Sequence, residues 1–66
     1  MKMKRYVIQH SNGAAIADFD YLMCAVLEFG ALYDDGILEY GDVLYDRLDK
    51  RVLYTYDDIW VRSQVR

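Results

Sequence analysis

The chain has no proline, only four glycines and a single cysteine, Cys24, among its 66 residues. A lone cysteine excludes a disulfide within the chain. Because secreted domains of this size are usually rich in disulfides, we expect a reducing, cytoplasmic location. The N-terminal sequence MKMKRYVIQH contains no apolar signal-peptide core. The apolar run from Tyr21 to Tyr33 is too short to cross a bilayer, so we expect no membrane association.

Side chains that carry enzyme chemistry are equally scarce. The chain has one histidine and one cysteine, too few for a zinc site within one copy, and it has no EF-hand or glycine-rich phosphate loop. His10 and Ser11 are adjacent, but no spacing links them to an aspartate as a catalytic triad. Cys24 falls among apolar residues of a predicted helix, where a structural, unreactive thiol is expected. We predict no enzyme activity, no cofactor and no metal.

The chain is nevertheless rich in apolar side chains. It is 55% hydrophobic and 15% aromatic, which is a globular rather than a disordered composition. Residues 1–66 form a single domain near the lower size limit for a self-supporting core. A sphere this small cannot bury all of these side chains, so we expect a homodimer or a partner protein to cover some of them.

The charges are strongly segregated along the chain. Residues 1–5 carry a net charge of +3, residues 6–46 carry eight acids and no lysine or arginine, and residues 47–66 carry a net charge of +2. The formal total of −3 hides this pattern. Solubility alone favours mixed charge, so a block of 41 residues without a base suggests a surface for a basic partner. The alternative interpretation is a solvated face without a partner.

Local patterns predict a strand at 5–10, a turn at Ser11-Asn12-Gly13, and a helix from Asp20 to Tyr33 that is capped by Asp18 or Asp20. That helix should end at Asp34-Asp35-Gly36, and its apolar residues suggest that it is covered on more than one side. A second, short helix is predicted from Asp42 to Lys50, followed by a hairpin of residues 51–56 and 59–66. The expected fold is α+β, with both helices packed on a small antiparallel sheet of the first strand and the hairpin.

The segment GDVLYDRLDKRVLYTYDDIWVRS, residues 41–63, resembles the recognition helix and wing of winged-helix domains. The resemblance covers about a third of the chain and implies a DNA-binding transcriptional regulator that acts as a dimer. The outer face of the predicted second helix opposes this function, because three of its five residues are acids and would be repelled by phosphates. Those five residues are Asp42, Tyr45, Asp46, Asp49 and Lys50.

A second route to nucleic acid would use the basic residues at the two ends of the chain. The strand alternation predicts that Trp60 is partly exposed beside Arg62, on the sheet face opposite the core. The alternative nucleic-acid-binding set is therefore Lys4, Arg5, Arg51, Trp60 and Arg62.

The favoured hypothesis is a non-catalytic inhibitor or adaptor that binds a basic groove on a host protein, one that normally handles nucleic acid. Tyrosines are common interface anchors, and complementary charge steers association. Small acidic proteins of this kind resemble viral, phage and mobile-element proteins that inhibit host nucleases or transcription. A subunit that serves only assembly is a third possibility. The predicted partner-binding residues are Tyr33, Asp34, Asp35, Glu39, Tyr40, Asp42, Tyr45 and Asp46.

Overall fold

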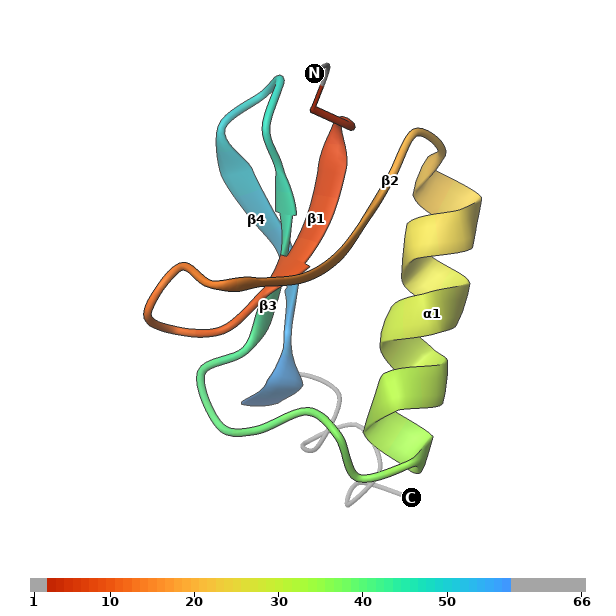
Figure 1. Ribbon diagram of the computed structural model, residues 1–66, viewed down its shortest axis with the longest axis vertical. Coiled ribbons are helices and arrows are strands. Elements are labelled where there is room, and N and C mark those ends of the chain that lie inside the picture. Colours follow the sequence, from red (N-terminus) through yellow and green to blue (C-terminus); the bar gives the residue numbers. More distant parts are fainter. Residues whose placement is uncertain (1–2, 58–66) are drawn as a thin grey trace.

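The computed structural model describes residues 3–57, which form a four-stranded antiparallel sheet with a helix against one face (Figure 1). The strand order across the sheet is β2-β1-β3-β4. The α+β class with a small antiparallel sheet is therefore confirmed. The elements in chain order are β1 (Tyr6–Gln9), β2 (Ala15–Phe19), α1 (Leu22–Asp34), β3 (Val43–Asp46) and β4 (Arg51–Thr55).

The first strand and its turn lie where the sequence predicts them. Strand β1 falls within the predicted range 5–10, and its first three residues are buried. In the turn, the side-chain oxygen of Asn12 accepts a hydrogen bond of 2.9 Å from the backbone N–H of Ala14. Gly13 has a φ of 90°, a conformation that costs glycine little. The Asn-Gly pair thus reverses the chain and starts β2.

Strand β2 is not predicted from the sequence, which assigned Asp18 or Asp20 to a helix cap. The strand pairs with β1 in a register that places Tyr6 opposite Phe19 and Ile8 opposite Ala17. Its alanines weaken the apolar alternation, so pairing with β1 decides its conformation. The predicted cap is wrong, because Asp18 lies inside β2 and the N-cap residue, Tyr21, makes no side-chain cap hydrogen bond.

Helix α1 begins two residues after its predicted start and ends one residue after its predicted end. It packs on the sheet through one side. Its buried residues are Ala25, Phe29 and Leu32, which recur at helical spacing. Within residues 3–57 the sheet covers only this side of the helix, so cover on a second side, by another copy or a partner, stays a prediction. Met23 and Leu27 point away from the sheet side and are 69% and 66% exposed.

The end of α1 has the geometry of a Schellman motif, as the predicted stop at Asp34-Asp35-Gly36 suggests. The N–H of Gly36 donates to the carbonyl of Tyr33 at 3.1 Å, and the N–H of Ile37 donates to the carbonyl of Leu32 at 3.0 Å. Gly36 has a φ of 74°, which this motif requires at its left-handed position. The chain consequently leaves the helix in a fixed direction.

The predicted second helix from Asp42 to Lys50 is wrong, because residues 43–46 are strand β3 and residues 47–50 form a turn. Strand β3 is hydrogen-bonded on both edges, to β1 and to β4. Its burial alternates, with Leu44 and Asp46 buried between half-buried neighbours. The segment is short, and two sheet partners outweigh its weak helical pattern.

The arrangement expected at the C-terminal end also differs. Strand β4 confirms that the first part of the predicted hairpin is extended, but its partner is β3. The predicted second strand, residues 59–66, lies outside the described residues, as does Trp60. The winged-helix-like arrangement is not confirmed, since the segment expected to be its recognition helix is a strand and a turn.

The core lies between α1 and the sheet. Phe29 of the helix, Ile8 of β1 and Leu44 of β3 are at most 2% exposed, and Leu38 closes the core from the loop before β3. No helix among residues 3–57 has the length and hydropathy needed to cross a membrane.

Gly36 and Gly30 provide tests of backbone strain that should give opposite results. Neither would bring a new Cβ within 4 Å of another atom, so a steric clash does not contribute. Gly36→Ala should lower the free energy of unfolding by about 1 kcal/mol, because alanine is strained in the left-handed region. Gly30→Ala, inside α1, should raise it by roughly 0.5–1 kcal/mol. Urea unfolding measures both, and the same sign for both variants would contradict the assigned helix end.

Candidate functional site

The eight residues predicted to bind a partner do not share one surface. Asp34, Asp35, Glu39 and Tyr40 are exposed, and Tyr33 and Tyr45 are half-buried. Asp42 and Asp46 are only 1% and 2% exposed, so the prediction that they belong to the docking surface is wrong. The buried pair and the exposed group have different roles.

Asp46 is held at the end of β3 by charge and by backbone donors. Both of its oxygens accept hydrogen bonds from the Arg5 guanidinium, each at 3.0 Å. One oxygen also accepts from the backbone N–H groups of Leu48 and Asp49, at 3.0 and 3.2 Å. The hydrogen bond from Arg5, supported by these amides, lowers the pKa of Asp46 to about 2. This carboxylate therefore fixes the turn into β4.

Asp42 lies just before β3, at the other end of that strand from Asp46. One oxygen lies 3.0 Å from Nδ1 of His10, and the other accepts the backbone N–H of Glu39 at 2.8 Å. The carbonyl of Asp42 also accepts the N–H of Tyr56 at 2.9 Å. The residue thus ties the loop before β3 to the end of β1 and to the chain after β4.

Together these contacts form a clamp around the central strand pair, made by Arg5, His10, Asp42 and Asp46. Arg5 and His10 flank β1, while Asp42 and Asp46 stand before and at the end of β3. Because β1 and β3 are antiparallel, Arg5 meets Asp46 at one end of the ladder and His10 meets Asp42 at the other end. The clamp explains why two acids of the acidic block are buried.

The exposed residues gather at the opposite end of the molecule from the N-terminus. In Figure 1 the green chain leaves α1 at the bottom, whereas the N-terminus and the β3–β4 turn are at the top. Tyr40 is 82% exposed and Ile37 is 51% exposed, so this end also presents apolar surface. We call this group the acidic end; it consists of Asp34, Asp35, Ile37, Glu39 and Tyr40.

The acids at the end of α1 work against helix stability. A helix C-terminus carries partial negative charge and favours cations, yet the last turn of α1 has no base and is followed by Asp35. Asp34 and Asp35 are both exposed, and neither forms an ion pair within residues 3–57. The contacts within residues 3–57 therefore give these two acids no stabilising role in the fold.

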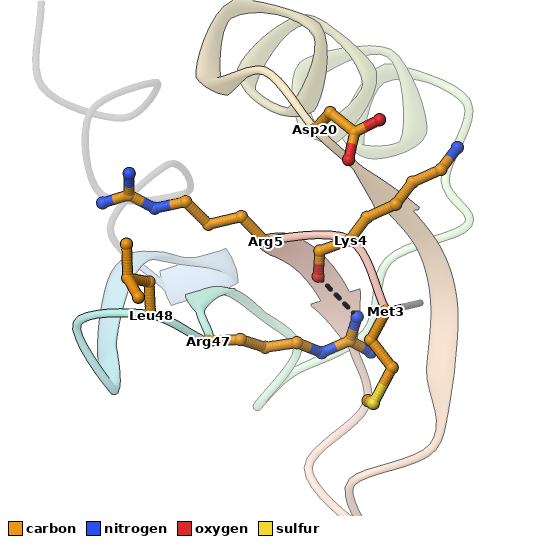
Figure 2. Close-up of a pocket in the computed structure, with 6 residues that line it drawn as sticks. All are labelled: Met3, Lys4, Arg5, Asp20, Arg47 and Leu48. Atoms are coloured by element: carbon orange, nitrogen blue, oxygen red, sulfur yellow. Dashed lines mark hydrogen bonds between the residues drawn. The ribbon is translucent and has the colours of Figure 1, made fainter. Parts of the chain in front are cut away.

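The basic residues at the other end are mostly occupied by carboxylates. Figure 2 shows an open hollow lined by Met3, Lys4, Arg5, Asp20, Arg47 and Leu48. The guanidinium of Arg47 donates to the carbonyl of Lys4 at 2.7 Å and to Asp18 at 3.3 Å. Arg5 is held by Asp46, so among the three bases that line the hollow only Lys4 has no carboxylate partner within residues 3–57.

The alternative nucleic-acid-binding residues are not brought together as a group. Lys4 is exposed, Arg5 is half-buried, and Arg51 begins β4 with a side chain 69% exposed. Trp60 and Arg62 lie outside the described residues.

Reactive side chains do not converge elsewhere in residues 3–57. Cys24 is exposed, so the structural role expected from its apolar helix neighbours does not include a place in the core; its lack of reactivity stays a prediction. No cluster of three or more histidine, cysteine, aspartate or glutamate side chains in the described part is placed to hold a metal ion. His10 does meet a carboxylate, that of Asp42, which the sequence could not indicate because the two residues are 32 positions apart.

Comparisons with protein-family models, with curated proteins and with solved structures found no match to this chain.

Reversing the charges at the end of α1 should stabilise the fold. Asp34→Lys/Asp35→Lys places cations where the helix dipole favours them, and we expect the free energy of unfolding to rise by about 1 kcal/mol. Thermal unfolding should show a melting temperature roughly 4–8 °C higher. Asp20→Lys, at the other end of the helix, is the control and should show no such gain. A lower melting temperature for the double variant would mean that these acids support folding.

The clamp predicts a specific acid sensitivity. The pKa of Asp46 is about 2 in the fold, below its ordinary value of 3.8, so its contribution to stability is complete above about pH 4. That contribution is lost as the pH falls from about 4 to 2. Asp46→Asn should therefore be less stable than wild type in urea at pH 7, and the difference should shrink steadily below pH 4. A difference that is independent of pH would contradict the ion pair.

Proposed function

We propose that this protein is a non-catalytic inhibitor or adaptor that acts in the cytoplasm by binding a protein through its acidic end. The partner presents a basic groove, and the best candidates are proteins that handle nucleic acid. The observation that carries the proposal is the position of Asp34 and Asp35, exposed at a helix C-terminus where they oppose folding. Exposed Tyr40 and Ile37 beside them supply apolar contact area.

The acidic end is also held in a defined shape, which reduces the entropy lost on binding. The Schellman motif fixes the start of the loop, and the buried Leu38 anchors its middle. Asp42 fixes its end through the N–H of Glu39. Three fixed points within seven residues support a pre-organised surface rather than a loosely solvated tail.

The competing proposal, a winged-helix regulator that binds DNA, has less support. Its recognition helix would span Asp42 to Lys50, but residues 43–46 are a strand, and the acids just before it and at its end, Asp42 and Asp46, are buried. A gel shift with labelled duplex DNA at low salt separates the two proposals, since only the regulator requires binding at micromolar protein.

The test of the proposed function starts with capture of a partner by tagged protein from nuclease-treated host lysate. The purified partner is then titrated with wild type, with Asp34→Asn/Asp35→Asn, and with the control Asp20→Asn/Asp49→Asn. Each variant removes two exposed acids. The first removes both from the C-terminal end of α1, whereas the control removes one just before α1 and one in the β3–β4 turn.

We expect the first variant to bind about fivefold more weakly at low salt, through slower association, and to lose much of its salt dependence. The control should stay within about twofold of wild type. Equal affinities for wild type and Asp34→Asn/Asp35→Asn would show that the acidic end is a solvated face only.

A further inference from the structure

The outer side of α1 carries an apolar row that nothing in residues 3–57 covers. Met23, Leu27 and Ala31 follow one another at a spacing of four residues, and all three are exposed. The row lies opposite the buried side of the helix formed by Ala25 and Phe29. Soluble domains seldom leave a row of this kind open unless it binds something.

This row leads directly into the acidic end. Asp34 falls one further helical turn beyond Leu27 and Ala31, and the loop with Ile37 and Tyr40 follows. The two surfaces are thus continuous, apolar along the helix and acidic with aromatic character at its end. From Met23 to Asp34 the row extends over about 16 Å, which is about three helical turns.

Charge decides what can cover this surface. Helix α1 has no lysine or arginine, and its own acids are Glu28 and Asp34. A second copy packed antiparallel on α1 would bring Asp20 of one molecule near Asp34 and Asp35 of the other. A parallel copy would place Asp34 against Asp34, so self-pairing concentrates like charge in either orientation.

We propose that the outer side of α1 and the acidic end form one docking surface, and that its occupant is a basic amphipathic helix that lines the groove of the partner protein. The proposal rests on the proposed function and specifies the partner's contacting element. The apolar side of such a helix packs on Met23 and Leu27, and its lysines or arginines reach Asp34, Asp35 and Glu39. The small residues Gly30 and Ala31 allow the two helices to approach closely.

The probe is a fluorescent peptide of about 18 residues, made of leucine and lysine in an amphipathic helical pattern. A scrambled peptide of the same composition retains the charge and loses the apolar side. The protein variants are Met23→Ser/Leu27→Ser and a matched control, Met3→Ser/Leu48→Ser. Met23 and Leu27 are 69% and 66% exposed, and the control residues, which line the hollow of Figure 2, are both 69% exposed. Urea unfolding checks that each variant folds.

We expect the helical peptide to bind the full chain at low salt and to shift amide NMR signals along α1 and through residues 34–40. Met23→Ser/Leu27→Ser should weaken binding by about tenfold, while the control variant stays within about twofold of wild type. The scrambled peptide should bind at least about tenfold more weakly than the helical one.

Four results would overturn the inference. Equal binding of the two peptides would show that charge alone drives association. Equal effects of the two variants would show that the peptide does not bind specifically at α1. In either case, the titration of Asp34→Asn/Asp35→Asn against the captured partner would still decide the proposed function. Absence of peptide binding also rejects an amphipathic occupant. A dimer in sedimentation that Met23→Ser/Leu27→Ser alone converts to monomer would assign the surface to a second copy.

Discussion

The structure depends on two buried carboxylates that hold the central strand pair. Asp42 and Asp46 stand before and at the end of β3, and each meets a side chain beside β1, His10 and Arg5 respectively. Buried acids are costly without partners, and here their oxygens accept hydrogen bonds from backbone amides as well as from the side chains. A chain of this size has few apolar contacts to spare, so such contacts specify the register that a small core leaves weakly determined.

The clamp also connects the fold to the surface. Asp42 binds the N–H of Glu39, so the same carboxylate that closes the β1–β3 ladder shapes the acidic end. At the opposite end, Asp46 takes up Arg5 and Asp18 contacts Arg47, which neutralises much of the basic charge there. The acidic end has no equivalent neutralisation in the described residues. Among residues 3–57, the acids at the end of α1 are thus without an ion-pair partner, whereas Arg5 and Arg47 at the opposite end are paired.

The sequence predicts those parts of the fold that local patterns determine. The Ser11-Asn12-Gly13 turn and the helix over the apolar run have local signals, and both form. Strands β2 and β3 do not, because Ala15 and Ala17 pack little and the short segment around Leu44 suits either a helix or a strand until it is paired. The clamp joins residues 32 and 41 positions apart, a separation that no local pattern reports. For the same reason, acid content marked one predicted partner-binding segment and could not separate the buried Asp42 and Asp46 from the exposed Asp34 and Asp35.

The difference between buried and exposed acids bears on the role of Asp34 and Asp35. An acid that bonds to amides and a guanidinium is accounted for by folding, as Asp46 is. Asp34 and Asp35 are instead set against the negative end of a helix dipole, each at a cost of roughly 0.3–1 kcal/mol when exposed. A domain with a small core has little stability in excess, and neutral or basic residues would fit the same Schellman motif. The proposed basic partner would account for their presence at this position, because it turns a local cost in folding into a gain on binding.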